Sequence, residues 1–115
     1  MKTLLASFLS SMFAVAPAIA QGPTPPGPGW TYGYPSTWQG MDKEHWFKVA
    51  DRRKHLVTVR KLIYKYQTKE WSERSVTAIN CNAMQWKLVG DTSSWSLFSP
   101  GTQGMLLYDF ACSGY

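Results

Sequence analysis

The chain contains two cysteines, Cys81 and Cys112, and their positions constrain its fold more than any other feature. Cys112 stands three residues before the C-terminus, where a chain needs an anchor to stay ordered. Two cysteines in an exported chain are more often bonded than free. A bridge between them would stabilise the fold by about 3.7 kcal/mol in the chain-entropy model. The alternative is two reduced cysteines. A metal site is disfavoured, since neither has a Cys or His close by in the sequence.

The first twenty residues indicate export. Lys2 supplies a positive start, the run TLLASFLSSMFAVA is apolar and uncharged, and Ala18 and Ala20 form an A-x-A cleavage pattern. A transmembrane anchor, the alternative, needs about 20 apolar residues. We therefore expect a signal peptide over residues 1–20, cleaved after Ala20, and a periplasmic or secreted product. Gln21 follows the cut, so a lipid-anchor cysteine is not expected there.

Length and charge limit the class of function. The chain has 12 Lys and Arg against 7 Asp and Glu, a net charge of +5, and one of these lysines lies in the leader. The remainder is long enough for one domain. A positive balance favours anionic partners, and export makes nucleic acid the least favoured of them. Phosphate-loop and zinc-finger spacings are absent from the sequence, and no membrane span is expected after the leader.

Residues 21–41 read QGPTPPGPGWTYGYPSTWQGM and are rich in proline and glycine. Its apolar residues do not recur at the period of a helix or a strand, so the segment favours an extended, polyproline-like conformation. It carries Trp30, Tyr32, Tyr34 and Trp38, too many aromatic residues for an inert spacer. We interpret it as an N-terminal arm that is dispensable for folding and precedes a domain over residues 42–115.

The first half of that domain favours strands. Residues 42–54 contain good helix formers, but Trp46, Lys48 and Ala50 alternate with apolar neighbours, which favours a strand. The run KHLVTVRKLIYKYQ is rich in β-branched and aromatic residues and predicts a long strand. Its apolar residues change face near Arg60 and Lys61, which predicts a bulge or a bend.

The second half predicts a hairpin and a helix. QTKEWSER is a polar connection, SVTAINC and AMQWKLV are two strands joined by a tight turn, and WSLF is a short strand or a turn. SPGTQGMLLYDFAC predicts a C-terminal helix with Ser99 as its N-cap. Runs of strands followed by a helix indicate an α+β fold. We expect a small antiparallel sheet of four to six strands with one C-terminal helix, stapled by one disulfide.

The sequence offers no convincing catalytic constellation. His45 and His55 lie on separate expected strands, and two histidines do not make a zinc site without further ligands. The acidic residues are scattered, and the G-x-S-x-G pattern of a nucleophile elbow is absent. We therefore predict a protein that is not an enzyme, with no catalytic residues, no metal and no cofactor.

The strongest functional signal is a concentration of basic residues interleaved with aromatic ones. Such a face can bind an anionic glycan or an acidic protein surface, and a homodimer is also compatible with it. The alternative is a solvated sheet face whose lysines protect an edge strand. The candidate binding residues are Arg52, Arg53, Lys54, Arg60, Lys61, Tyr64, Tyr66 and Trp71.

A set of scattered residues over 44–112 is similar to the pattern of a known family. The matching residues are Trp46, Ser75 through Asn80-Cys81, Gln85-Trp86, Trp95, Pro100-Gly101-Thr102, and Leu107-Tyr108 through Cys112. In these the chain resembles the surface-adhesin protein E-like family of exported bacterial proteins. The resemblance implies a small antiparallel sheet with a C-terminal helix and a disulfide.

Two functions follow as expectations. The first is an exported, non-catalytic module of the binding or adhesion type, which recognises protein or anionic polymer through the basic and aromatic sheet face. The alternative is a structural accessory subunit of an extracytoplasmic assembly that docks through the N-terminal arm. A secreted hydrolase ranks third.

Overall fold

The computed structural model describes residues 22–92 and 94–113. The expected signal peptide lies outside these residues. The elements, in chain order, are β1 (Thr31–Trp38), β2 (Met41–Arg53), β3 (Leu56–Lys65), β4 (Glu70–Glu73), β5 (Thr77–Asn80), β6 (Gln85–Leu88), β7 (Ser96–Leu97) and α2 (Gly104–Cys112).

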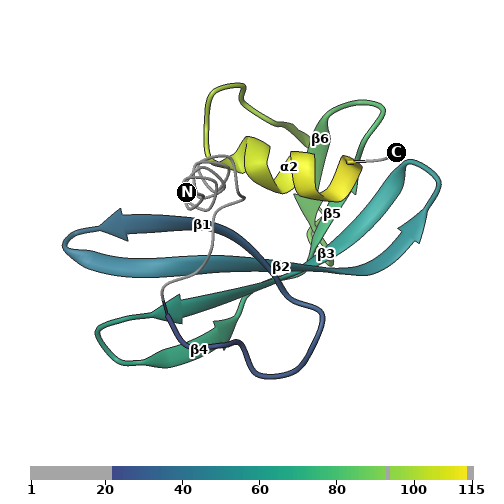
Figure 1. The fold of residues 1–115 in the computed structure, drawn as a ribbon. Helices are drawn as coiled ribbons and strands as arrows, with labels where there is room; N and C mark the ends of the chain where they lie inside the picture. Colours follow the sequence, from purple (N-terminus) through teal and green to yellow (C-terminus); the bar gives the residue numbers. More distant parts are fainter. Residues whose placement is uncertain (1–21, 93, 114–115) are drawn as a thin grey trace, which may run out of the picture.

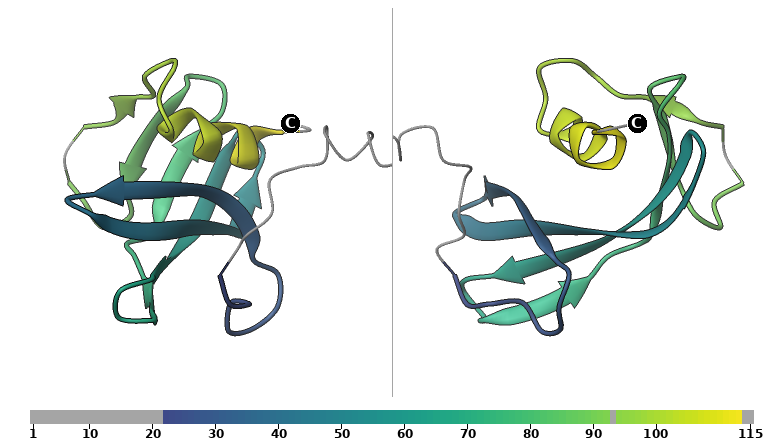
Figure 2. Two further views of the ribbon diagram at one scale, coloured as in Figure 1. Left: turned by 60° about the vertical axis from the view of Figure 1, so that its left-hand side comes forward. Right: turned by 45° about the vertical axis from the view of Figure 1, so that its right-hand side comes forward.

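The strands form one curled antiparallel sheet. Its order is β1-β2-β3-β5-β6-β7, and β4 pairs with β3 off this path. The first four residues of β3 pair with β5, and its last four pair with β4, so the sheet divides beyond β3 into two wings. The helix α2 lies against one side of the sheet, which curves around it (Figures 1 and 2). We call that side the inner face and the opposite side the outer face.

The predicted fold class is confirmed in its coarse form. An antiparallel sheet, a C-terminal helix and a disulfide are all present. The sheet is larger than expected and makes up most of the described chain, so the label α+β fits only in part. The ambiguous segment 42–54 is a strand, as the alternation predicted, and the segments SVTAINC and AMQWKLV contribute the antiparallel pair β5 and β6.

The structure corrects the interpretation of residues 31–38, which form the edge strand β1 rather than part of an arm. Gly33 and Pro35 obscured its period. Proline is tolerated because an edge strand leaves N–H groups unpaired. A Cβ atom at Gly33 would lie 2.5 Å from the Phe47 ring, so the strand needs glycine there. The two-residue turn Gln39–Gly40 has positive φ at both positions, as a type I′ hairpin requires.

Two further expectations about strands were wrong. Glu70–Glu73, taken for a polar connection, forms β4 against β3. The register of β2 with β3 is continuous at Arg60 and Lys61, and the irregularity lies in β2 between Val49 and Asp51. The apolar residues change face because β3 buries side chains on both sides of the sheet.

The main core lies between the inner face and α2. Its buried residues are Phe47, Val57, Val59, Ile79, Cys81, Phe98, Leu107 and Ala111. Cys81 and Cys112 form the predicted disulfide, with their Cα atoms 5.6 Å apart. The Tyr108 hydroxyl also donates a hydrogen bond to the Cys81 carbonyl, at 2.9 Å. The C-terminal end of α2 is thereby fixed to the sheet.

The helix begins later than predicted. Its first residue is Gly104, preceded by Gln103, so Ser99 is not the N-cap. The Ser99 carbonyl instead accepts hydrogen bonds from the backbone N–H and the hydroxyl of Thr102. Gly101 has a φ of +81°, a left-handed conformation that a helix cannot continue through.

Candidate functional site

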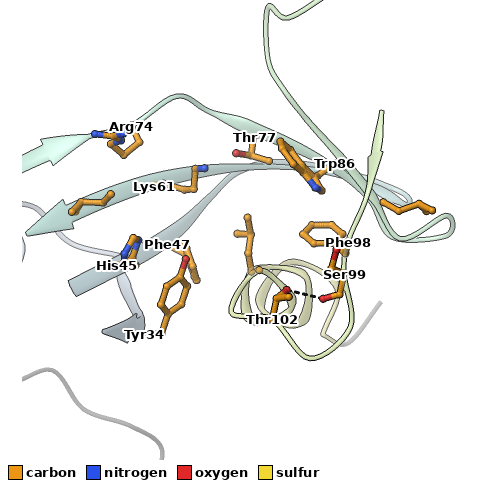
Figure 3. A pocket seen from close by; sticks show the side chains of 14 residues that line it. Tyr34, His45, Phe47, Lys61, Arg74, Thr77, Trp86, Phe98, Ser99 and Thr102 are labelled. Atoms are coloured by element: carbon orange, nitrogen blue, oxygen red, sulfur yellow. Dashed lines mark hydrogen bonds between the residues drawn. The ribbon is translucent and has the colours of Figure 1, made fainter. Parts of the chain in front are cut away.

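A cleft of about 490 Å³ lies between the inner face of the sheet and the segment that runs from β7 into α2. Its walls come from most of the chain: from β1, β2 and β3, from the residue after β4, from β5 and β6, and from α2 (Figure 3). Its side chains divide into a polar group and an apolar group. No Asp or Glu occurs among the described residues that line it.

Two cationic side chains, Lys61 and Arg74, form the polar end. Lys61 pairs with Phe47 in the β2–β3 register, so its side chain points to the inner face. Arg74 follows β4, and its backbone N–H donates to the Lys61 carbonyl at 2.8 Å, which fixes the two residues side by side. Burial lowers the pKa of Lys61, and the charge of Arg74 lowers it further. Neither side chain has a carboxylate partner within the described part of the chain.

His45 is the third basic residue of the polar end. Burial, and then the charges of Lys43, Lys61 and Arg74, lower the pKa of its imidazole to about 4. Its Nε2 atom is hydrogen-bonded to the Ser36 hydroxyl at 2.7 Å, and its ring stacks on Tyr34 with 4.4 Å between centroids. The imidazole is therefore neutral at pH 7. The positive surroundings oppose its protonation and favour negative charge in the cleft.

Thr77 supplies a buried hydroxyl at the same end. The residue is 1% exposed, and its Oγ1 atom has no hydrogen-bond partner among the residues that the structure describes. Figure 3 shows this oxygen and the Lys61 amino group turned toward one another along the sheet wall of the cleft. An unsatisfied buried hydroxyl costs about 1–3 kcal/mol, so such a group calls for an explanation. A ligand atom between Thr77 and Lys61 would satisfy it.

The other end of the cleft is apolar. Phe47 and Leu107 are core residues that also line the cleft. Trp86 and Phe98 form the wall toward β7 (Figure 3). Phe98 is held by a backbone hydrogen bond to Met84 and by ring contact with Tyr108. A cleft with a mostly apolar wall and a few convergent polar groups is typical of small-ligand sites.

The structure separates the basic residues that the sequence grouped. Arg52, Arg53 and Lys54 are exposed at the β2–β3 hairpin end, where Arg53 pairs with Asp51 at 2.9 Å. Arg60 points to the outer face, where Glu73 accepts two hydrogen bonds from its guanidinium, at 2.7 and 2.9 Å. Lys61, the next residue, points into the cleft.

The aromatic candidates lie on the outer face, away from Lys61. They belong to a contiguous group of rings that we call the outer aromatic cluster. Tyr64 is 4% exposed, and the Tyr66 hydroxyl donates to Glu44, which is itself buried. The predicted face is therefore not one surface. The members of the cluster are Tyr32, Trp46, Tyr64, Tyr66 and Trp71.

Lys61 is the one predicted binding residue that lines the cleft as the structure describes it. The other lining residues were missed, among them His45, Arg74, Thr77 and Trp86. One signal could have found part of the site. Val57, Val59, Lys61 and Ile63 share the parity of a single strand, so period 2 alone places Lys61 beside an apolar inner face. The proximity of Arg74 and Thr77 depends on strand pairing and is not visible locally.

The segment 22–30, predicted as arm, covers part of the outer face. The Gly22 N–H donates to the Glu44 carboxylate at 2.8 Å, and the Lys48 amino group donates to the Pro28 carbonyl at 2.9 Å. The Trp30 ring lies beside the charged groups of Lys48 and Arg60, at 5.6 and 5.1 Å from its centroid. The segment binds its own sheet.

Comparison with protein-family models, with curated proteins and with solved structures finds no match to this chain. The described ranges contain no helix long and apolar enough to cross a membrane. Within the same ranges, His, Cys, Asp and Glu residues form no group of three or more that could hold a metal ion.

Proposed function

We propose that the protein is an exported, non-catalytic binding module that holds an anionic group of its ligand at the polar end of the cleft. One observation carries the proposal: Lys61, Arg74 and the buried Thr77 hydroxyl line the same cleft, and the described residues of its lining contribute no carboxylate to balance the two cations. Burial lowers the pKa of Lys61, and the charge of Arg74 lowers it further, so the two adjacent cations also repel each other in this half-buried site. An anion would relieve that repulsion.

The chemistry of the cleft supports binding rather than catalysis. The Ser36–His45 pair has the elements of a nucleophile and a base, but a general base works best with a pKa near the operating pH. The pKa of His45 is lowered to about 4. No described carboxylate bonds to the imidazole to stabilise its charged form, as the third member of a catalytic triad does.

Export is supported by the signal-like leader and is compatible with the disulfide, a bond that persists in oxidising compartments. The resemblance to adhesin E-like proteins also agrees with a binding role. The alternative role, an accessory subunit that docks through its arm, is less well supported, because residues 22–38 are bonded to the protein's own sheet.

The test is a titration of the mature, oxidised protein with sodium phosphate at low ionic strength, followed by backbone NMR. We expect chemical-shift changes around Lys61, Arg74 and Thr77, and an affinity that falls as salt is added. Lys61→Met should weaken phosphate binding at least tenfold. Arg52→Gln removes one charge at the hairpin end and is the matched control. Equal weakening by both variants, or no change at the cleft, would contradict the proposal.

A further inference from the structure

We infer that the ligand of the cleft is an amphipathic monocarboxylic acid, with its carboxylate between Lys61, Arg74 and Thr77 and its hydrocarbon body along the apolar wall. The inference rests on the proposed function and names the ligand class for the same cleft. It follows from the two unlike ends of one cavity and from the unsatisfied Thr77 hydroxyl at its polar end.

The polar end matches a carboxylate in its donors. A guanidinium offers parallel N–H donors that fit two carboxylate oxygens, and Lys61 adds an ammonium donor. The Thr77 hydroxyl can donate a third hydrogen bond to the same group. His45 is neutral at pH 7, so two cations face the ligand, and the single negative charge of a carboxylate is compensated when it is buried.

The apolar end matches a hydrocarbon chain. Phe47, Phe98 and Leu107 are 2%, 7% and 8% exposed, so only their cleft-facing atoms remain for a ligand. Trp86 adds an aromatic wall opposite the helix (Figure 3). A sugar acid would leave hydroxyl groups against these side chains without partners, at a cost for each. A hydrocarbon chain has no such groups to satisfy.

The experiment compares ligands that differ either in the head group or in the length of the hydrocarbon chain. The oxidised mature protein is titrated by calorimetry with butanoate, hexanoate, octanoate and decanoate, and with 1-octanol, octyl phosphate and glucuronate. We expect affinity to rise by up to about fourfold for each added methylene. Octanol, which matches octanoate without the charge, should bind at least tenfold more weakly. Octyl phosphate and glucuronate should bind more weakly than octanoate.

Two variants of Thr77 test the head-group site without disturbing the fold. Thr77→Val keeps the shape and removes the hydroxyl, so octanoate affinity should fall about three- to tenfold. The melting temperature should stay equal or rise, because an unsatisfied buried group is lost. Thr77→Ser keeps the hydroxyl and should retain binding. Bound octanoate should also raise the pKa of His45 from about 4, since a nearby anion favours the imidazolium.

The outcomes separate the inference from the function on which it rests. If butanoate and phosphate bind as tightly as octanoate, the anion site stands and the amphipathic ligand is overturned. If octanol binds as tightly as octanoate, the cleft recognises no charge and both are overturned. Tighter binding of octyl phosphate or glucuronate, or unchanged binding in Thr77→Val, would overturn the assignment of a carboxylate at this position.

Discussion

The two faces of the sheet use the same kinds of side chain in opposite ways. Arg60 and Lys61 are neighbours on β3, but Arg60 is paired with Glu73 on the outer face, whereas Lys61 has no carboxylate partner in the described ranges. Glu44 and His45 are neighbours on β2. Glu44 accepts hydrogen bonds from the outer face, and His45 is kept neutral on the inner face. The outer face is satisfied from within the chain, whereas Lys61 and Arg74 on the inner face have no carboxylate partner among the described residues.

A basic residue is a candidate for ligand binding only where the fold provides no partner for its charge. Segment 22–30 and β4 bring carbonyl groups, Trp30 and Glu73 to the outer cations. On the inner side, α2 contributes apolar side chains to the cleft and no acid. The amino-acid composition alone would predict the same binding properties for both faces.

The largest expected effect comes from removing the outer cover together with the edge strand. A protein that begins at Gln39 loses β1 and the hydrogen bond from Gly22 to Glu44, and exposes one side of β2. We expect it to lose its cooperative thermal transition. A protein that begins at Thr31 keeps β1 and should lose less stability. A transition for the Gln39 form within a few degrees of the mature protein would restore the arm interpretation.

The disulfide should affect the inner face selectively. Replacing both Cys81 and Cys112 with Ser should lower the free energy of unfolding by about 2–5 kcal/mol, because the end of α2 is no longer fixed to the sheet. Denaturant unfolding measures the loss, and NMR should show the changes concentrated around the cleft. Intact mass with alkylation, without reductant, should first show no free thiol in the mature protein. Two alkylated thiols would contradict the bridge.

Glu44→Gln tests the outer face. The carboxylate accepts hydrogen bonds from the Tyr66 hydroxyl and the Gly22 N–H, and a buried acceptor of this kind costs about 1–3 kcal/mol to disturb. The bond to Glu44 raises the pKa of Tyr66 to about 12, so the variant should bring that pKa back toward 10, as NMR of the ring can show. Asp42→Asn changes an exposed acid on the same strand and should cost less than about 0.5 kcal/mol.

His45 should make the inner face sensitive to acid. Its folded pKa of about 4 is lower than the unfolded value of 6.5, so the unfolded state binds a proton first as the pH falls. The contribution of His45 to the free energy of unfolding is present above pH 6.5 and is lost as the pH falls toward 4. The upper limit of this contribution is about 3 kcal/mol. Solvent screening of the partly exposed ring reduces it to about 1–2 kcal/mol. The free energy of unfolding of His45→Gln should therefore fall less between pH 7 and 4.5 than that of the unaltered protein. If the two proteins show the same dependence on pH, the lowered pKa of His45 is refuted.

The smallest effect is expected at the β2–β3 hairpin end, which belongs to neither face. Changing Arg52, Arg53 and Lys54 to Ser should alter the free energy of unfolding by less than about 0.5 kcal/mol. Phosphate binding in the cleft should be unchanged. Retention on heparin at low salt should decrease, because three exposed charges are lost. Unchanged retention would assign these charges to solubility alone.

Local patterns explain which elements were predicted. The alternation around Trp46 identified β2, the tight turn near Asn82 identified the β5–β6 hairpin, and the apolar run before Cys112 identified the helix. Each signal lies within one element, where backbone period and side-chain chemistry act together. β1 was missed because Gly33 and Pro35 interrupt its alternation, and β4 was missed because its residues are mostly polar. In both strands, pairing with a neighbouring strand outweighs the local sequence preference.

The sequence by itself determined that the chain pairs Cys81 with Cys112, builds an antiparallel sheet and ends in a helix. Only the tertiary structure decided which charges are neutralised. Lys61 meets Arg74 and Thr77 because β3 is paired with β4 along one half and with β5 along the other. Partners of this kind depend on strand register between distant segments. A period-2 pattern fixes the face to which a side chain points, but not the side chain that it will meet there.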